Sequence, residues 1–202
     1  MQYKTHLVAS LVVALPVMAA TATLGVGAIA AVSLGALLPD IDEPHSWIGR
    51  RTRGISDIIN KAFGHRGITH SLVAVGVLTL IMTVLAVTLS FPPVIAGYFI
   101  LGYLLHLIED SFSKSGVAWL QPFSDRNFQS GFGVVYYTTG KAVESVLFLL
   151  LIIVLLFQIK TLDFSPAIAA VTEQLSHVKG IVTEKLEEGL SGIFNIVLIL
   201  KT

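Results

Sequence analysis

Seven histidine and aspartate side chains lie at the ends of long apolar runs, where they could bind metal ions together: His6, Asp40, Asp42, His65, His70, His106 and Asp110. The chain has no cysteine, so thiolate ligands, disulfides and a cysteine nucleophile are excluded. A mixed nitrogen and oxygen set favours Zn²⁺, with Mn²⁺ or Fe²⁺ as alternatives, over an all-oxygen Mg²⁺ or Ca²⁺ cage. Seven ligands exceed the three or four of one catalytic zinc, so one or two divalent ions are expected, a pair being ~3.5–4 Å apart.

The spacings indicate how these side chains converge. His106 and Asp110 are four residues apart and share one face of a helix. His65 and His70 are five apart, ~140° around an ideal helix, so they need a glycine-containing turn to meet. In the sequence Pro39-Asp-Ile-Asp42, an extended backbone would point both carboxylates the same way.

Each of these residues alone also has an ordinary explanation. A single histidine or aspartate beside a membrane is usually an interfacial polar group or a helix cap, and Ser71 or Thr69 suits an N-cap. Arg66 alone is typical of a membrane anchor, but beside a metal site it is a candidate phosphate contact. Charged groups at the edge of the hydrocarbon are costly, and seven metal-capable ones on one face favour a shared site.

Composition identifies the setting as a membrane. The 202 residues are 54% hydrophobic and only 13% charged, about half the usual share, and the mean hydropathy is +0.80. These values exclude a water-soluble globule, a disordered chain and a coiled coil. Lys+Arg and Asp+Glu are 13 each, so no basic excess favours nucleic acid, and membrane lipids are the expected partners.

The first apolar run, residues 5–39, contains no Asp, Glu, Lys or Arg. One helix of this length would be ~52 Å long, against a hydrocarbon core of ~30 Å. We therefore predict a hairpin of two short helices, 4–20 and 25–38; a tilted single helix and a cleaved signal peptide are the alternatives. Only the hairpin places all seven candidate ligands at one face of the membrane.

The remaining apolar runs predict three more helices. Residues 67–108 carry no formal charge, and Phe91-Pro-Pro93 divides them into spans near 71–90 and 94–110. A further span covers 141–159. Residues 164–202 show the period of an amphipathic helix that lies on a membrane or against a partner. The prediction is an all-α polytopic membrane bundle with five hydrophobic helices over residues 1–160, followed by an amphipathic tail over 161–202.

Basic residues set the expected orientation. They concentrate in the 40–69 and 111–141 loops and are absent from the reversal at 90–93, so both loops, and the metal site with them, are predicted to face the cytoplasm. Four aromatic residues are predicted interface anchors: Trp47, Trp119, Tyr136 and Tyr137.

Three motifs in order, Leu37–Asp42, Phe63–Ser71 and Leu101–His106 with Asp110, resemble those of a bacterial family of LexA-regulated inner-membrane proteins assigned as metal-dependent hydrolases. The resemblance covers residues 4–123. It implies a helical protein of the cell inner membrane with a His/Asp metal site and hydrolase activity, and the seven residues named above occupy the family's polar motif positions. A remote similarity extends to zinc-dependent phospholipase C and P1 nuclease.

The chain departs from that family at two places. Glu43 follows the Asp-Ile-Asp motif where a basic residue or histidine is common. Ser113-Lys-Ser115 stands where a Thr-Pro pair often precedes Gly116-Val117. Both differences lie outside the ligand set, so they bear on substrate contacts more than on metal binding.

Two functions are therefore expected, from different classes. The first is metal-dependent hydrolysis of a phosphoester such as a phospholipid at the membrane interface, with Arg66 on the phosphate and Glu43 or Glu109 as candidate bases. The second is a non-enzymatic protein that binds or senses a metal. Transport is disfavoured because residues 71–105 carry no ionisable relay. The 164–190 helix could recruit a protein partner in either case, and the sequence does not define an oligomeric state.

Overall fold

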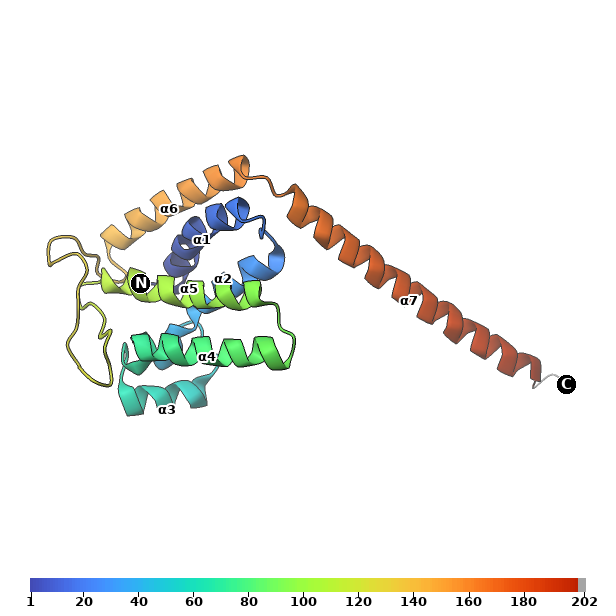
Figure 1. The fold of residues 1–202 in the computed structure, drawn as a ribbon, viewed down its shortest axis with the longest axis horizontal. Helices are drawn as coiled ribbons and strands as arrows, with labels where there is room; N and C mark the ends of the chain where they lie inside the picture. Colours follow the sequence, from blue (N-terminus) through green and yellow to red (C-terminus); the bar gives the residue numbers. More distant parts are fainter. Residues whose placement is uncertain (200–202) are drawn as a thin grey trace. The chain divides into compact units, whose positions relative to one another are not determined.

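The computed structural model describes the backbone of residues 1–199 and the side chains of residues 1–190. The chain forms two compact units, Met1–Leu162 and Asp163–Thr202. Helices of the first unit are α1 (Tyr3–Ala20), α2 (Val26–Leu37), α3 (Arg53–Phe63), α4 (Leu72–Thr88), α5 (Pro93–Ser111) and α6 (Ala142–Thr161), with 3₁₀ turns η1 (Pro39–Asp42) and η2 (Ile68–His70) (Figure 1). The predicted all-helical bundle is confirmed for the described residues.

The N-terminal hairpin is present. α1 and α2 agree with the predicted helices within two residues, and the break falls at residues 21–25. Pro16 lies inside α1 and does not make the turn. Instead, the hydroxyl groups of Thr21 and Thr23 lie within hydrogen-bonding distance of Tyr98 Oη, at 3.2 and 2.5 Å, which ties the turn to α5.

The Pro92-Pro93 reversal also lies where it was predicted, between α4 and α5. Proline fits here because the first turn of a helix needs no backbone donor. Ser71, at the start of α4, is the expected N-cap, and its hydroxyl accepts from Ala74 N at 3.3 Å. α4 and α5 therefore run in opposite directions beside each other (Figure 1).

α5 is the central helix of the unit and packs most extensively on α2, with further contacts to α1 and α4. Glycines allow the close approach of α2 and α5. A Cβ on Gly102 would lie 2.2 Å from Val32 O, and one on Gly35 would lie 2.0 Å from Phe99 O. His106 is one helical turn after Gly102, so this contact also positions a candidate ligand.

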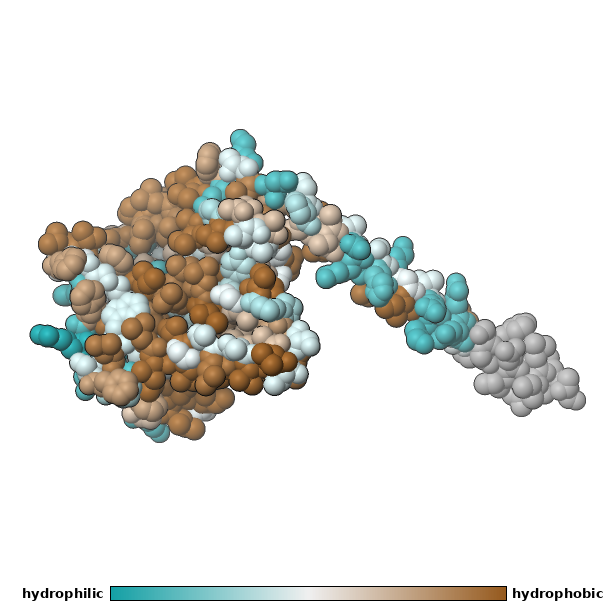
Figure 2. Space-filling model, in the orientation of Figure 1, coloured by the Kyte–Doolittle hydropathy of each residue, from teal (hydrophilic) through white to brown (hydrophobic). Residues whose placement is uncertain are grey.

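Within the part of the chain that the structure describes, three helices are long and apolar enough to cross a membrane: α1, α5 and α6, with α4 a shorter apolar helix. α2 has only 12 residues, ~18 Å, and is a core helix between its neighbours. α6 packs on α1 and leaves most of its apolar side chains exposed, as a lipid-facing helix does. Hydrophobic side chains dominate the visible face of this unit (Figure 2).

The connection between α2 and α4 contains a helix that the sequence pattern did not predict. α3 occupies residues 53–63 within the segment expected to be a loop. It packs on η1, and Asn60 Nδ2 donates to Asp42 O at 2.7 Å. η1 in turn contacts α2, α5 and η2, so the loop segments that carry the motifs meet at one end of the bundle.

The second unit contains α7 (Ser165–Ile199), which agrees with the predicted tail helix up to residue 199. Its apolar side chains at the predicted three- and four-residue steps are exposed, among them Ile168, Val178 and Leu186. The end of the predicted tail, residues 200–202, lies outside the described residues.

Candidate metal centre

Five of the seven predicted ligands lie together at this end of the bundle. They form two overlapping groups, His6 with His106 and Asp110, and Asp40 with His70 and His106, and the ligand atoms within each group lie within 4.8 Å of one another. The five come from α1, η1, η2 and α5. All five residues are at most 8% exposed. This convergence depends on the N-terminal hairpin, which returns Asp40 to the level of His6.

Two of the imidazoles are fixed by carboxylates behind them. His6 Nδ1 lies 2.6 Å from Glu109 Oε2, and His70 Nδ1 lies 3.0 Å from Asp42 Oδ2. An ionised carboxylate only accepts, so each Nδ1 carries the proton and donates it. The Nε2 lone pair of each ring then faces the centre. A carboxylate behind a histidine is the arrangement that orients metal-bound imidazoles.

His106 is fixed in the same way by the backbone. Its Nδ1 donates to Ala36 O at 2.7 Å, near the end of α2. Its Nε2 lies 3.2 Å from His70 Nε2 and 3.6 Å from Asp40 Oδ1. Two lone pairs at 3.2 Å repel each other unless a proton or a cation lies between them.

The Nε2 atom of His6 is buried and has no hydrogen-bond partner among the described residues. It lies 3.4 Å from Asp110 Oδ1. Buried polar atoms normally have a partner, because leaving one without costs ~1–3 kcal/mol. A divalent cation between His6, His106 and Asp110 would satisfy this nitrogen.

The geometry also constrains how many ions the centre can hold. His106 Nε2 has one lone pair and can bind only one ion, so the two groups cannot both be complete at once. Asp110 can serve both sides, because Oδ1 faces His6 and Oδ2 lies 3.8 Å from His70 Nε2. The residues could therefore hold one ion, or two if Asp110 contributed an oxygen to each and His106 contributed to one of them.

Asp110 has further contacts with cationic and hydroxyl groups. Arg66 Nη2 lies 2.7 Å from Oδ2, and Oδ1 accepts from Tyr137 Oη at 2.8 Å and from the Met1 amino group at 2.7 Å. Burial, with Asp110 beside the ring, raises the pKa of Tyr137 above its ordinary value, so the hydroxyl stays protonated and donates. Tyr137 is thus a buried contact of Asp110, and the prediction that it anchors the chain at the interface is wrong.

The structure does not bring Asp42 and His65 into either group. Asp42 Oδ1 accepts from His65 Nδ1 at 3.0 Å, and Oδ2 accepts from Thr69 Oγ1 at 2.5 Å and Arg66 N at 2.9 Å, besides His70. Burial raises the pKa of Asp42, but the hydrogen bonds from His65, His70 and Thr69 outweigh it and hold the pKa well below its usual range. Asp42 orients the histidines around it and does not face the centre.

The expectation that Asp40 and Asp42 point the same way is wrong. Residues 39–42 form a 3₁₀ turn and not an extended segment. With three residues per turn, side chains two apart lie ~120° from each other. Asp40 therefore faces His106, and Asp42 faces the 65–70 turn.

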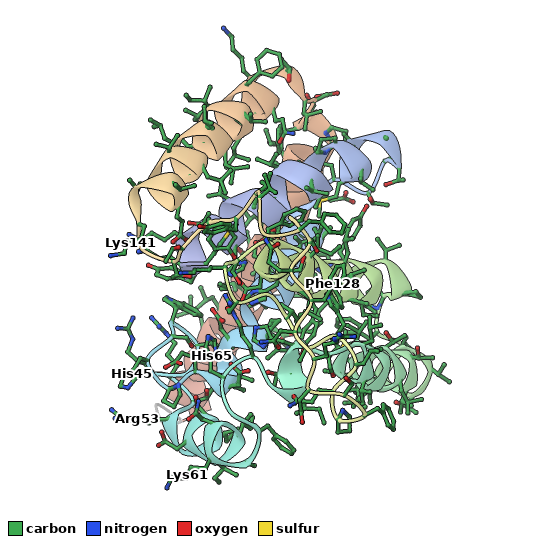
Figure 3. The ribbon with its side chains drawn as sticks, turned by 90° about the vertical axis from the view of Figure 1, so that its left-hand side faces the viewer. His45, Arg53, Lys61, His65, Phe128 and Lys141 are labelled. Atoms are coloured by element: carbon green, nitrogen blue, oxygen red, sulfur yellow. The ribbon has the colours of Figure 1, made fainter. Side chains whose placement is uncertain are left out.

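His65 lies at the mouth of the centre. It belongs to a polar pocket of about 310 Å³ that also includes Asp40, Glu43, Arg66 and Asp110. Its side chain is 40% exposed, and Figure 3 shows it within the outline of the unit, whereas Arg53 and Lys61 of α3 point outward at the edge. Burial lowers the pKa of His65, but the adjacent Asp42 carboxylate outweighs this and raises it.

Sequence reasoning named Glu109 only as a candidate base and did not predict that it orients His6. Glu109 is held by His6 and by Ser10 Oγ, which donates to Oε1 at 3.0 Å. His6 and Ser10 are four residues apart on α1. This spacing on α1, together with the Glu109-Asp110 pair on α5, was the sequence signal that could have predicted the contact between His6 and Glu109.

We expect Asp42→Asn to weaken metal binding about 10- to 100-fold, because His70 loses the charged acceptor that orients it. Competition with a chelator on the purified protein measures this affinity. Asp57→Asn, on α3 and outside both groups, is the matched control. Equal affinity of the Asp42→Asn variant and the wild type would show that Asp42 does not support the ligands.

Comparison with known proteins places the chain in a family. The model of the YdjM inner membrane protein family matches residues 1–168. The inner membrane protein YdjM of Escherichia coli and that of Shigella flexneri are each 44% identical over 90 residues, 44% of this chain and 46% of theirs. YvsG of Bacillus subtilis, described as uncharacterised, is 35% identical over 94 residues, 46% of this chain and 56% of its own length.

These alignments span about half the length of the relatives they match. No solved structure matches the chain. The family match covers all of the hydrophobic helices and every candidate ligand. The chain belongs to the YdjM inner membrane protein family.

Proposed function

We propose that the protein is a metal-dependent hydrolase that cleaves a phosphoester, such as that of a phospholipid, at the membrane interface. The proposal rests on three imidazoles, those of His6, His70 and His106. A hydrogen bond at Nδ1 fixes each ring, and the Nε2 atoms face the carboxylates of Asp40 and Asp110. Nitrogen and carboxylate ligands of this kind suit Zn²⁺, with Mn²⁺ or Fe²⁺ as alternatives.

A bound divalent ion would supply a water whose pKa falls to ~7 and would neutralise charge on the phosphoryl oxygens. The chain's own groups have separate roles. His6, Asp40, His70, His106 and Asp110 would hold the ion. Glu109 and Asp42 orient imidazoles.

Groups at the mouth would act on the substrate. Arg66 lies between the centre and the surface, where its guanidinium can bind a phosphate. Both oxygens of Glu109 already accept hydrogen bonds, whereas Glu43 lines the polar pocket. Glu43 is therefore the better placed of the two candidate bases.

The position of the centre favours a lipid-derived substrate. The ligands lie at helix ends, at the level where headgroup phosphates are found beside a bundle of this kind. The basic loops around the centre support a cytoplasmic orientation by the positive-inside rule. Control of expression by LexA, which the sequence resemblance implies, stays a prediction.

The direct test is turnover by purified protein of a chromogenic phosphodiester and of phospholipids, with Zn²⁺ or Mn²⁺. We expect hydrolysis that requires the metal and falls at least about 100-fold in His70→Ala, because an orienting and ligating imidazole is lost. His177→Ala, on α7, is the control. Absence of turnover in protein that holds its metal at full stoichiometry would overturn the proposal.

One observation favours a second function, metal binding or sensing without catalysis. His6, His70 and His106 are 0% exposed, and Arg66 is paired with Asp110 on the side toward the mouth. An ion enclosed in this way could hold the turns η1 and η2 against the helices α1 and α5 and so stabilise the fold. Metal-dependent stability without turnover would identify this function.

A further inference from the structure

Two further pockets lie beside the candidate metal centre, in addition to the 310 Å³ pocket at its mouth, and they differ in chemistry. The first, the polar pocket of the 113–115 loop, has a volume of about 410 Å³ and is lined by Arg66, Ser113, Lys114, Ser115 and the 137–139 segment. It has two cationic side chains and several hydroxyl groups, and no acidic residue lines it. Groups of this kind bind phosphate oxygens.

Arg66 supports an anion in this pocket. Its Nη1 donates to Ser113 Oγ and Ser115 Oγ, both at 2.5 Å, and its Nη2 pairs with Asp110. Its Nε is buried and has no hydrogen-bond partner among the described residues. Arg66 therefore has one N–H group that still requires an acceptor.

The second pocket, the α5–α6 groove, has a volume of about 390 Å³. Ile108 and Phe112 of α5 form one wall, and Val143, Leu147 and Leu151 of α6 form the other. The three α6 residues are four apart and form a single stripe along the helix. Because α5 and α6 both pack on α1, its floor includes Ala9 of that helix.

Tyr137 connects the two pockets. It lines both of them, and its hydroxyl donates to Asp110 at the centre. Glu109, which orients His6, also lines the groove. The groove and the polar pocket of the 113–115 loop therefore share Tyr137 as a wall beside the centre, and the groove lies between helices long enough to cross a membrane.

We propose that the protein binds a phospholipid with an acyl chain in the α5–α6 groove and its phosphate in the polar pocket of Arg66 and Lys114. The identity of the reaction at that phosphate rests on the proposed function, but the binding does not. A free phosphate ion would use the polar pocket alone, whereas the adjoining apolar groove matches a ligand that is charged at one end and aliphatic at the other. The groove would hold the acyl chain by van der Waals packing along the Val143–Leu151 stripe.

Binding by the detergent-solubilised full chain tests this without any turnover. The probe is a fluorescent long-chain phosphatidic acid, displaced by unlabelled long-chain phosphatidic acid, by long-chain diacylglycerol or by inorganic phosphate. We expect phosphatidic acid to compete at least about tenfold better than either of the others, because each of them fills only one pocket. Competition by inorganic phosphate as strong as that by the lipid would overturn the assignment in favour of free phosphate.

Leu147→Trp fills the groove, and Leu149→Trp, on the opposite face of α6, is its matched control. We expect the Leu147→Trp variant to bind long-chain phosphatidic acid about tenfold more weakly and the Leu149→Trp variant to bind within about twofold of the wild type. Metal content should be unchanged in both, which verifies the fold. Equal effects of the two variants on lipid binding would overturn the acyl-chain assignment. A change of oligomeric state confined to the Leu147→Trp variant would also overturn it, and would identify a second copy of the protein as the occupant of the groove.

Lys114→Ala tests the polar pocket separately. Its binding of phosphatidic acid should fall several-fold while its binding of diacylglycerol stays unchanged, and an equal loss for both lipids would overturn the phosphate assignment. If the lipid binds as described but is never cleaved, the proposed hydrolase function fails and the binding site remains.

Discussion

His106→Ala is expected to abolish binding of divalent metal, the largest effect of any single substitution in the centre. His106 is the one residue common to both candidate groups. Its loss leaves His6 with Asp110 on one side and Asp40 with His70 on the other, and Asp110 can serve both sides. Each group then keeps a single imidazole, whereas catalytic zinc sites normally have at least two nitrogen or sulfur ligands.

Metal analysis of protein purified without added chelator measures this result. The wild type should hold one or two equivalents per chain and the His106→Ala variant should fall to background. His45→Ala is the control, because His45 lines the 310 Å³ pocket at the mouth of the centre but belongs to neither group. An unchanged helical circular dichroism spectrum would show that the variant has folded. Full metal content in a folded His106→Ala variant would contradict the ligand assignment.

Gly102→Ala is expected to destabilise the bundle and disturb the centre together. The added Cβ would lie 2.2 Å from Val32 O and 2.9 Å from Ala36 N. Both are backbone atoms, so no change of side-chain rotamer can relieve the clash. α2 and α5 must therefore separate, at a cost of about 1–3 kcal/mol. The separation also moves Ala36 O away from His106 Nδ1.

Thermal unfolding of the solubilised protein measures the effect. For a chain of this size, a loss of about 1–3 kcal/mol lowers the unfolding temperature by at least about 2–4 °C. Gly97→Ala, on the same helix, places its Cβ in open space, with no described atom beyond its own helix within 4 Å, and should be neutral or slightly stabilising. Equal unfolding temperatures for the two variants would contradict the close packing of α2 on α5.

The membrane helices were predictable because their signals are local. The length of the charge-free run at residues 5–39 exceeds one span, and the Pro92-Pro93 pair stops a helix wherever it occurs. α3 was not predicted, because its apolar side chains Ile55 and Ile58 are exposed and it is held by contacts with η1 that only the fold creates.

Within the candidate centre, the pair His106 and Asp110 followed from helical spacing, and the structure places both on one face of α5. The different orientations of Asp40 and Asp42 could not be predicted, because they depend on a 3₁₀ turn whose formation is not apparent from four residues. Ala36 O was not predictable as a partner of His106, since a backbone carbonyl has no residue signature. Such contacts depend on the approach of α2 and α5.

The central claim, that His6, Asp40, His70, His106 and Asp110 hold divalent metal, is tested most directly by X-ray absorption at the edge of the metal that co-purifies with the full chain. The predicted spectrum shows imidazole nitrogens at ~2.0–2.1 Å together with carboxylate oxygens, and a metal–metal distance of ~3.5–4 Å if two ions are present. A spectrum with oxygen ligands only, or protein that purifies without metal and takes up none on titration, would contradict it.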